Sequence, residues 1–446
     1  MVAAALTNAL VAATRFGYAP KPGELASIAQ DPRGWALHQL DTKPAALDPG
    51  LPASPGMVAA MLQARQDFAK NKDPDFRKTE NQRLRAVYLA ELDARLYAAV
   101  DGDAPLLERL TRFWSNHFTV SCVRPVIRGF AGAFEREAIR PHITGRFVDM
   151  LLAAERHPAM LFYLDQVLSI GPNSPAGQRQ HRGLNENLAR EMMELHTLGV
   201  DGGYTQNDVE ALARILTGWS IARLREADAG QFRFYPQLHE PGPQRLLGKT
   251  YPEGGYDQGE MALRDLAAHP ATATHLATKL ARHFIADDPP KEAVQRIATV
   301  FRDTGGDLKR VMQAVMREEA AWQPLTKVRM PEDLLIAACR VTGFTPPAPF
   351  QVRMLHVLDQ QPFFAPQPEG WSDRATEWIG PESVLHRADG CANFAARLPE
   401  PPDPATLADE VFGEALPDEA AQAIRHAASR REGLALLIAS PQFQRR

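Results

Sequence analysis

The feature that most constrains this chain is the recurrence of apolar residues at steps of three and four, in segments rich in Ala, Leu, Arg and Glu. The pattern is clear in residues 83–100, 106–114, 262–268, 271–285 and 293–301. Apolar residues at this spacing fall on one face of an α-helix, and these residue types favour helices. The 36 prolines stand mainly between the segments, as in a bundle with short and medium loops. The sequence therefore predicts an all-α, multi-helix fold.

One region departs from the helical pattern. Between residues 231 and 256, aromatic residues alternate with others, and the turn-forming residues Gly and Pro are frequent. This pattern predicts a small β-hairpin or an extended excursion. A chain of 446 residues also exceeds what one hydrophobic core usually supports. We therefore expect closely packed helical subdomains over 1–183, 184–330 (which carries the excursion) and 331–446.

The net charge, the apolar runs and the cysteines argue against several classes of protein, namely nucleic-acid-binding, membrane-spanning, exported and disulfide-bonded proteins. The net charge is −4, so no positive field would recruit nucleic acid, and we expect no nucleic-acid partner. No apolar run reaches the roughly 20 residues that a membrane-spanning helix needs. The alanine-rich start has no basic segment before its apolar part, so we expect a first helix rather than a signal peptide, and a cytoplasmic protein. Cys122, Cys339 and Cys391 match no metal or disulfide spacing and are expected to be free, buried thiols.

The most polar stretch begins NENLAREMMEL and predicts two helices joined by a Gly-rich turn. On a regular first helix, Asn187, Glu191 and Glu194 lie on one face, with Arg190 beside them. His196 falls with the apolar residues on the opposite side, so it does not chelate a metal with Glu194. Arg190 and Glu194 stand at i,i+4 spacing, which favours an ion pair. The polar face is either structural or the floor of a functional site.

The second half of this stretch carries clear local signals. Gly199, Gly202 and Gly203 permit the positive-φ backbone conformations that end the first helix. Thr205 is the predicted N-cap of the next helix, with Asp208 three residues later in a capping-box arrangement. The predicted core stripe of that helix is Val209, Leu212, Leu216 and Trp219.

Three further sets of polar residues carry candidate chemistry. His117, in RFWSNHFTVS, is bounded by large aromatic residues. It is either a satisfied core histidine or a ligand or general acid/base whose pKa its neighbours shift. His239 and Glu240, in LHEPGP, lie on a predicted loop, as an exposed site or as a pair that stabilises the turn. A basic stripe on one helical face consists of His275, Lys279 and His283, spaced four residues apart. We expect it to face an acidic neighbour, or to meet Glu191 and Glu194 across the core.

The leading hypothesis is an enzyme-like helical protein with a polar pocket, with or without a metal, formed by the NENLAREMMEL helix and the RFWSNHFT segment. Two carboxylates on one face could bind a divalent cation or share a proton. The predicted catalytic residues are His117, Arg190, Glu191 and Glu194, the substrate-binding residues are Asn187, His239 and Glu240, and the metal ligands are Glu191, Glu194 and His117. The cofactor stays unknown, and whether the protein is an enzyme stays open.

A haem protein of cyclooxygenase or peroxidase type is one alternative. The tripeptide HFT follows an aromatic run and precedes a carboxylate- and arginine-rich helix, and this order is similar to short motifs of such haem proteins. In that interpretation His117 would be the distal or axial residue.

Several sequence motifs, which occur in a fixed order, carry a resemblance that spans nearly the whole chain. They are ATRFGYAPKPGEL, RFWSNHFTVS, NENLAREMMELHTLGVDGGYTQNDVEALARILTGW, LHEPGPQRLLG, HPATATHLATKLARHFIADDPP and ASPQFQRR. Together they resemble the bacterial family called domain of unknown function 1800. The resemblance implies a mostly helical protein and no settled activity.

The resemblance also implies a third hypothesis, a non-catalytic helical partner. Members of that family are often encoded beside a second family, number 1501, which is similar to alkaline phosphatases and sulfatases and usually carries a twin-arginine export signal. This chain shows no such signal, so export would require either a signal-bearing partner or a longer precursor that carries the signal. The chain keeps FFAPQPEGW, but SDRATEW follows where the family has Gly-rich sequence, so no function is carried over to the loop around Trp371.

Overall fold

The computed structural model describes residues 2–71, 74–180 and 183–446. Its first twelve helices are α1 (Val2–Arg15), α2 (Glu24–Ile28), α3 (Pro32–His38), α4 (Ser54–Asn71), α5 (Pro74–Asp101), α6 (Pro105–His117), α7 (Ala131–Phe134), α8 (Phe147–Arg156), α9 (Pro158–Tyr163), α10 (Pro175–Gln180), α11 (Asn187–Glu191) and α12 (Gln206–Leu216). The others are α13 (Tyr256–Ala268), α14 (Pro270–Phe284), α15 (Lys291–Asp303), α16 (Leu308–Arg317), α17 (Pro331–Thr342), α18 (Ala348–Val357), α19 (Pro381–Ala396), α20 (Pro404–Phe412), α21 (Asp418–Arg425) and α22 (Arg430–Ala439). The strands are β1 (Trp219–Ile221), β2 (Phe232–Phe234), β3 (Gln244–Leu246) and β4 (Lys249–Tyr251).

This inventory confirms the predicted all-α class. The five segments with the helical apolar pattern fall within α5, α6, α13, α14 and α15, to within one residue. Several helices begin with a proline, among them Pro105, Pro270 and Pro331. Proline is tolerated there because the N–H that it lacks would have no acceptor within the helix. The alanine-rich start of the chain forms α1, as expected.

The β excursion consists of two antiparallel hairpins. β1 pairs with β2, with Trp219 opposite Phe234, and β3 pairs with β4. The excursion thus begins before residue 231, and the prediction that Trp219 continues the stripe of the preceding helix was wrong. α12 ends at Leu216 because Thr217 turns extended and Gly218 adopts a φ of +87°, a left-handed conformation that favours glycine.

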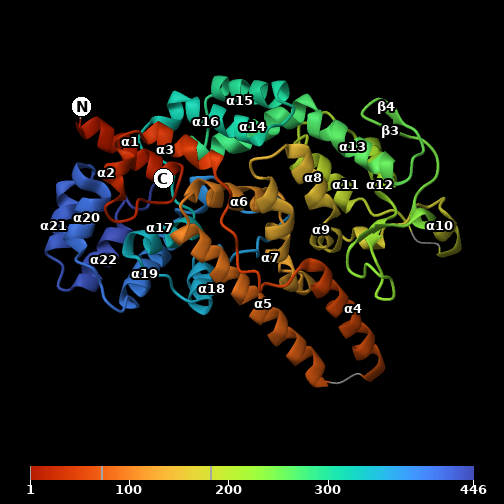
Figure 1. Cartoon of the computed structure of the whole chain (residues 1–446), viewed down its shortest axis with the longest axis horizontal. Helices are drawn as coiled ribbons and strands as arrows, with labels where there is room; N and C mark the ends of the chain where they lie inside the picture. The colour runs from red at the N-terminus through yellow and green to blue at the C-terminus, as the bar shows by residue number, and fades with distance from the viewer. Residues whose placement is uncertain (1, 72–73, 181–182) are drawn as a thin grey trace.

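The molecule is elongated, with an arm that projects from its side. α4 and α5 form this antiparallel arm, the C-terminal helices α19 to α22 gather at one end, and β3, β4 and α10 lie at the other (Figure 1). Near the outer part of the arm, Phe68 and Phe76 pack with ring centroids 5.8 Å apart. The second half of α5 returns to the body, where Leu92 and Leu96 are buried.

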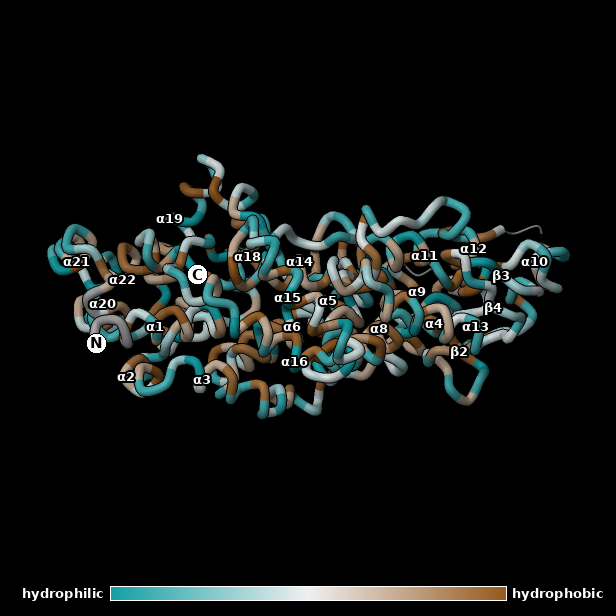
Figure 2. Tube along the Cα trace, turned by 90° about the horizontal axis from the view of Figure 1, so that it is seen from above, coloured by the Kyte–Doolittle hydropathy of each residue, from teal (hydrophilic) through white to brown (hydrophobic). Residues whose placement is uncertain are grey.

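A continuous apolar core runs through the body. Seen from above, hydrophilic segments follow many of the outer loops (Figure 2). The three cysteines are buried and free, as predicted. Among the described residues, no helix is long and apolar enough to cross a membrane.

Candidate functional site

Helix α6 carries most of the RFWSNHFTVS segment and divides it between two faces. At 100° per residue, Arg109, Arg112 and Asn116 share one face. Trp114 and His117 point to another side of the helix, and each is only 1% exposed. The polar residues of this segment therefore serve a different region of the interior from His117.

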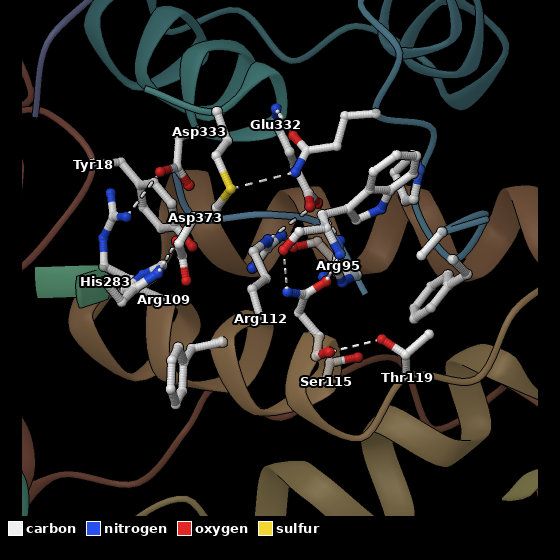
Figure 3. Close-up of a pocket in the computed structure, with 18 of the residues that line it drawn as sticks. Tyr18, Arg95, Arg109, Arg112, Ser115, Thr119, His283, Glu332, Asp333 and Asp373 are labelled. Carbon is white, nitrogen blue, oxygen red and sulfur yellow. Dashed lines mark hydrogen bonds and ion pairs between the residues drawn. The ribbon is translucent and has the colours of Figure 1, made fainter. Parts of the chain in front are cut away.

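A cavity of about 60 Å³ lies against the first face of α6, and we call it the α6 cavity (Figure 3). Its wall also includes residues that follow α1, residues at the start of α17 and parts of the segment 360–373. The polar residues of the wall are Tyr18, Arg95, Arg109, Arg112, Ser115, Asn116, Thr119, His283, Glu332, Asp333, Gln360 and Asp373. The site is thus assembled from segments that are far apart in the sequence.

The arginines of the wall are paired with the two acids at the start of α17. Arg112 Nε lies 3.2 Å from Glu332 Oε1, and Arg95 donates to the same oxygen. Arg109 Nη1 donates to Asp333 Oδ2 at 2.9 Å. In Figure 3, Arg109 and Asp333 lie to the left of Arg112, and Glu332 and Arg95 lie to its right. Buried charges that are paired in this way are held in fixed positions.

A further set of charges closes the cavity beside α14. His283 Nδ1 donates to Asp373 Oδ1 at 2.7 Å, and Arg446 Nη2 donates to the same oxygen at 3.2 Å. Burial alone would raise the pKa of Asp333, but Arg109 and Arg446 outweigh it and lower that pKa to about 2. Burial lowers the pKa of His283 to about 4, even though Asp373 acts to raise it. At neutral pH the cavity therefore holds ionised aspartates and a neutral histidine.

Two donors in the wall have no partner among the residues that the structure describes. They are the hydroxyl of Tyr18 and Nη2 of Arg109. The other donors of Arg109 are used, because Nε bonds to the carbonyl of Gly17 at 2.6 Å and Nη1 bonds to Asp333. The Arg109 guanidinium carbon lies 4.4 Å from the centre of the Tyr18 ring. Buried donors are normally satisfied, so these two require an explanation.

The side chain of Asn116 fastens the segment 360–373 over the end of α6. Its Nδ2 donates to the carbonyl of Trp371 at 2.8 Å, and its Oδ1 accepts from the N–H of Trp371 at 2.7 Å. Gly370 has a φ of +81°, and a Cβ there would lie 2.5 Å from the carbonyl oxygen of Asn116. Further along, Ser121 Oγ donates to the carbonyl of Ala365 at 2.7 Å. These contacts close the cavity on this side.

His117 lies in a separate cluster of histidines. Its Nε2 donates to the carbonyl of His196 at 3.1 Å, and its ring lies about 6 Å from the rings of both His196 and His275. His196 Nδ1 lies 2.7 Å from Glu155 Oε1. Burial lowers the pKa of His117 well below its usual value, and Lys279 and the other histidines lower it further. His117 is therefore neutral.

The NENLAREMMEL helix is not regular. α11 ends at Glu191 and continues as a single π turn over Met192–His196. The angular relations expected for a regular helix therefore stop at Glu191. The spacing predicted an ion pair between Arg190 and Glu194. This prediction was wrong, because Arg190 pairs with Glu186 at 2.8 Å.

The two glutamates of this helix remain near one another but are not part of the cavity wall. Both are half-buried, and Asn187 is exposed. Burial raises the pKa of Glu191, and the negative charges of Glu194 and Glu369 add to this effect. No hydrogen bond or ion pair joins His117 to either glutamate. Within the described ranges, no three His, Cys, Asp or Glu side chains could together hold a metal ion.

His239 and Glu240 are buried, with 6% and 3% exposure, and they hold neighbouring backbone. His239 Nδ1 donates to the carbonyl of Thr217 at 2.8 Å. Glu240 accepts from the N–H of Asn173 at 2.9 Å and from its side-chain amide at 2.5 Å. In the structure His239 thus ties the excursion to the residue after α12, and Glu240 ties it to the loop before α10.

Most residues of the cavity wall were not predicted from the sequence as site residues, among them Tyr18, Arg95, Asp333 and Asp373. One signal was present: helix α6 has the sequence PLLERLTRFWSNH, in which charged residues interrupt a strongly apolar run. Charges within a buried helix require partners and so point to a polar interior.

One family model matches residues 11–445, nearly the whole chain, and is described as "Protein of unknown function (DUF1800)". This finding confirms the family that the sequence motifs resembled. No curated protein and no solved structure matches the chain.

Proposed function

The chain belongs to the family described as "Protein of unknown function (DUF1800)", and we propose that it is a small-molecule-binding, enzyme-like protein whose ligand sits in the α6 cavity. The proposal keeps the RFWSNHFT half of the pocket expected from the sequence. It replaces the NENLAREMMEL half with Tyr18, the start of α17 and the segment 360–373.

The single observation that carries this proposal is the pair of unpartnered donors. Every carboxylate of the wall has a cationic or hydrogen-bonding partner, whereas the Tyr18 hydroxyl and Arg109 Nη2 have none among the described residues. A surplus of buried donors is satisfied by a group that brings acceptors. Burial raises the pKa of Tyr18 to about 12, so its hydroxyl remains a donor at neutral pH.

The size and charge of the cavity define the class of ligand. A volume of about 60 Å³ holds a few non-hydrogen atoms, such as a carboxylate or a phosphate group. Such groups accept several hydrogen bonds at once, and guanidinium groups recognise them well. The ligand we propose is therefore a small oxyanion, or the oxyanion end of a larger molecule.

Calorimetric titration tests the proposal with inorganic phosphate, acetate and oxalate as probes. We expect wild-type protein to bind at least one of them, and Tyr18→Phe to bind it about tenfold more weakly, since a hydrogen bond to a charged group contributes about 1.5–3 kcal/mol. Tyr88→Phe is the matched control, because the Tyr88 hydroxyl is also buried but donates to the carbonyl of Pro362. The proposal fails if no probe binds, or if both variants bind like the wild type.

A basic groove along α5 of the arm favours a second candidate function, docking of another protein surface. The groove has a volume of about 770 Å³, and no acid is among its lining residues. Its four cations make no ion pair with any residue in the described ranges; they are Arg77, Lys78, Arg85 and Arg128. Four unpaired cations with no acid beside them favour an acidic partner.

The chain itself carries a matching acidic surface. Residues 398–424 contain seven Asp and Glu residues and no Lys or Arg, and they form α20 and α21 at one end of the body. We propose that this end of a second copy docks in the groove, in a head-to-tail contact. The carboxylates that face solvent there include Asp409 and Glu410.

Sedimentation at low and high salt tests the docking. The wild type should associate at low salt and dissociate at high salt, because salt screens exposed charges. Arg77→Glu/Arg85→Glu and Asp409→Lys/Glu410→Lys should each stay monomeric alone, and a mixture of the two should associate. A wild type that stays monomeric at all concentrations would exclude this function.

A further inference from the structure

Lys279 occupies the centre of a rigid stripe on α14. It stands one turn from His275 and one turn from His283, on the same helical face. Both histidines are held in place, His275 by the carbonyl of Leu195 at 3.0 Å and His283 by Asp373. Lys279 therefore stands on this helical face between two side chains that are held in place.

The ammonium group of Lys279 has no close partner. Within the described residues, Nζ makes no hydrogen bond and no ion pair, although the side chain is half-buried. Lys327, a buried lysine nearby, shows the usual solution, because it pairs with Asp287 and donates to the carbonyl of Asp373. A half-buried amine loses part of its hydration, and among the described residues no hydrogen bond or ion pair compensates Lys279 for that loss.

The lysine borders an open recess of about 230 Å³. Besides Lys279, the recess is lined by Asn116 at the end of α6, by Arg282 of α14 and by residues 369–374. It shares Asn116, Trp371 and Asp373 with the wall of the α6 cavity. Small molecules can therefore reach the amine from solvent without opening the core.

The electrostatic surroundings favour the neutral amine. Burial lowers the pKa of Lys279 to about 8, and Arg282 lowers it too, while Asp373 and Glu369 act in the opposite direction. About a tenth of Lys279 is then neutral at pH 7, against roughly one part in 3,000 for an ordinary lysine. A neutral lysine amine is a nucleophile, and desolvation is a known way of activating it.

We infer that Lys279 is a reactive amine that condenses with small aldehydes or ketones in this recess to form an imine. The Nζ lone pair adds to the carbonyl carbon, and the carbonyl oxygen takes up a proton. The resulting carbinolamine loses that oxygen as water, and a C=N bond remains. Of the two amine hydrogens, one leaves in the water and the other is released as a proton, which balances the proton taken up by the oxygen. No oxidant or reductant takes part. The inference concerns a different recess from the α6 cavity and does not depend on oxyanion binding.

Reductive trapping on the intact protein tests the inference. Native protein is treated at pH 7 with a limiting amount of glyoxylate and cyanoborohydride, which reduces the imine to a stable carboxymethyl amine. Peptide mass spectrometry then gives the rate of modification at every lysine. We expect Lys279 to react at least about tenfold faster than exposed lysines, because the larger neutral fraction outweighs the lower nucleophilicity of a weaker base.

The controls separate this inference from the others. Lys249 and Lys309 are exposed or partly exposed lysines with ion-pair partners, and they provide the reference rates within the same sample. Lys279→Arg should lose the fast phase and leave the reference rates unchanged. A Lys279 rate equal to the reference rates overturns the inference, whatever the oxyanion titration shows. Oxyanion binding by the same protein is scored separately, so either result can fail alone.

Discussion

Replacing Tyr18 with Phe removes one hydroxyl from the wall of the α6 cavity and leaves the ring. The ring lies under the Arg109 guanidinium, and Phe preserves both its volume and most of this cation–π contact. The hydroxyl has no partner in the described protein, and the residue is fully buried. A buried polar group without a partner costs about 1–3 kcal/mol. We therefore expect Tyr18→Phe to raise the free energy of unfolding of the ligand-free protein by about 1 kcal/mol.

The control is the same substitution at a buried tyrosine that has partners. Tyr88 Oη donates to the carbonyl of Pro362 at 3.0 Å and accepts from the side-chain amide of Gln361 at 3.3 Å. Tyr88→Phe should lower the free energy of unfolding by about 1 kcal/mol, since it removes a bond and leaves a carbonyl unpaired. The two variants lose the same atom, so the difference in sign isolates the effect of the partner.

Urea titration followed by circular dichroism measures both variants against the wild type. The midpoint should rise for Tyr18→Phe and fall for Tyr88→Phe, with the slope of the transition unchanged. If Tyr18→Phe lowers the midpoint as much as Tyr88→Phe does, the hydroxyl has a partner in the folded protein. That result would refute the reasoning and remove the basis of the oxyanion proposal.

Four other expectations follow from the structure. Glu191→Gln should leave the urea midpoint unchanged or raise it, because burial and like charges raise the pKa of that carboxyl, whereas Glu108→Gln should lower it by breaking the pair with Arg140. Thr205→Ala should lower the free energy of unfolding by about 1 kcal/mol in the same titration, since the capping box is present in the structure. The midpoint should fall as the pH drops below about 6.5, because the folded-state pKa of His117 lies below its unfolded value, so the unfolded state binds the proton first; a midpoint that is flat between pH 7 and pH 5 would contradict this. Burial raises the pKa of all three cysteines, so iodoacetamide should modify none of them in native protein and all of them in urea, as counted by intact mass.

Local patterns accounted for the features that arise within one segment. The apolar spacing in α5, α14 and α15 predicted helices because periodicity depends only on neighbours along the chain. The Thr205 capping box was predicted for the same reason, since both of its hydrogen bonds close within four residues. The prediction failed for Trp219, whose position fits both the helical spacing and a strand. Pairing with Phe234, which is distant along the chain, places Trp219 in β1.

The site could be predicted only in part. Local spacing places Arg109, Arg112 and Asn116 on one face of α6, and the charged residues within that buried helix indicate a polar interior. Nothing local placed Tyr18 or Asp373 against that face. The stripe at Glu191 and Glu194 remains a prediction, and Glu191→Gln is its test.

By itself, the sequence determined the helical class, the helix start at Thr205 and the family, because each of these is encoded in short runs of residues. The tertiary structure alone decided which charges meet. It brings Tyr18, α6, α17 and Asp373 together around one cavity, and it gives Lys279 no hydrogen-bond or ion-pair partner among the residues that the structure describes. The physical reason is that burial and pairing depend on contacts between segments hundreds of residues apart. A pKa or an unsatisfied donor therefore exists only once those contacts have formed.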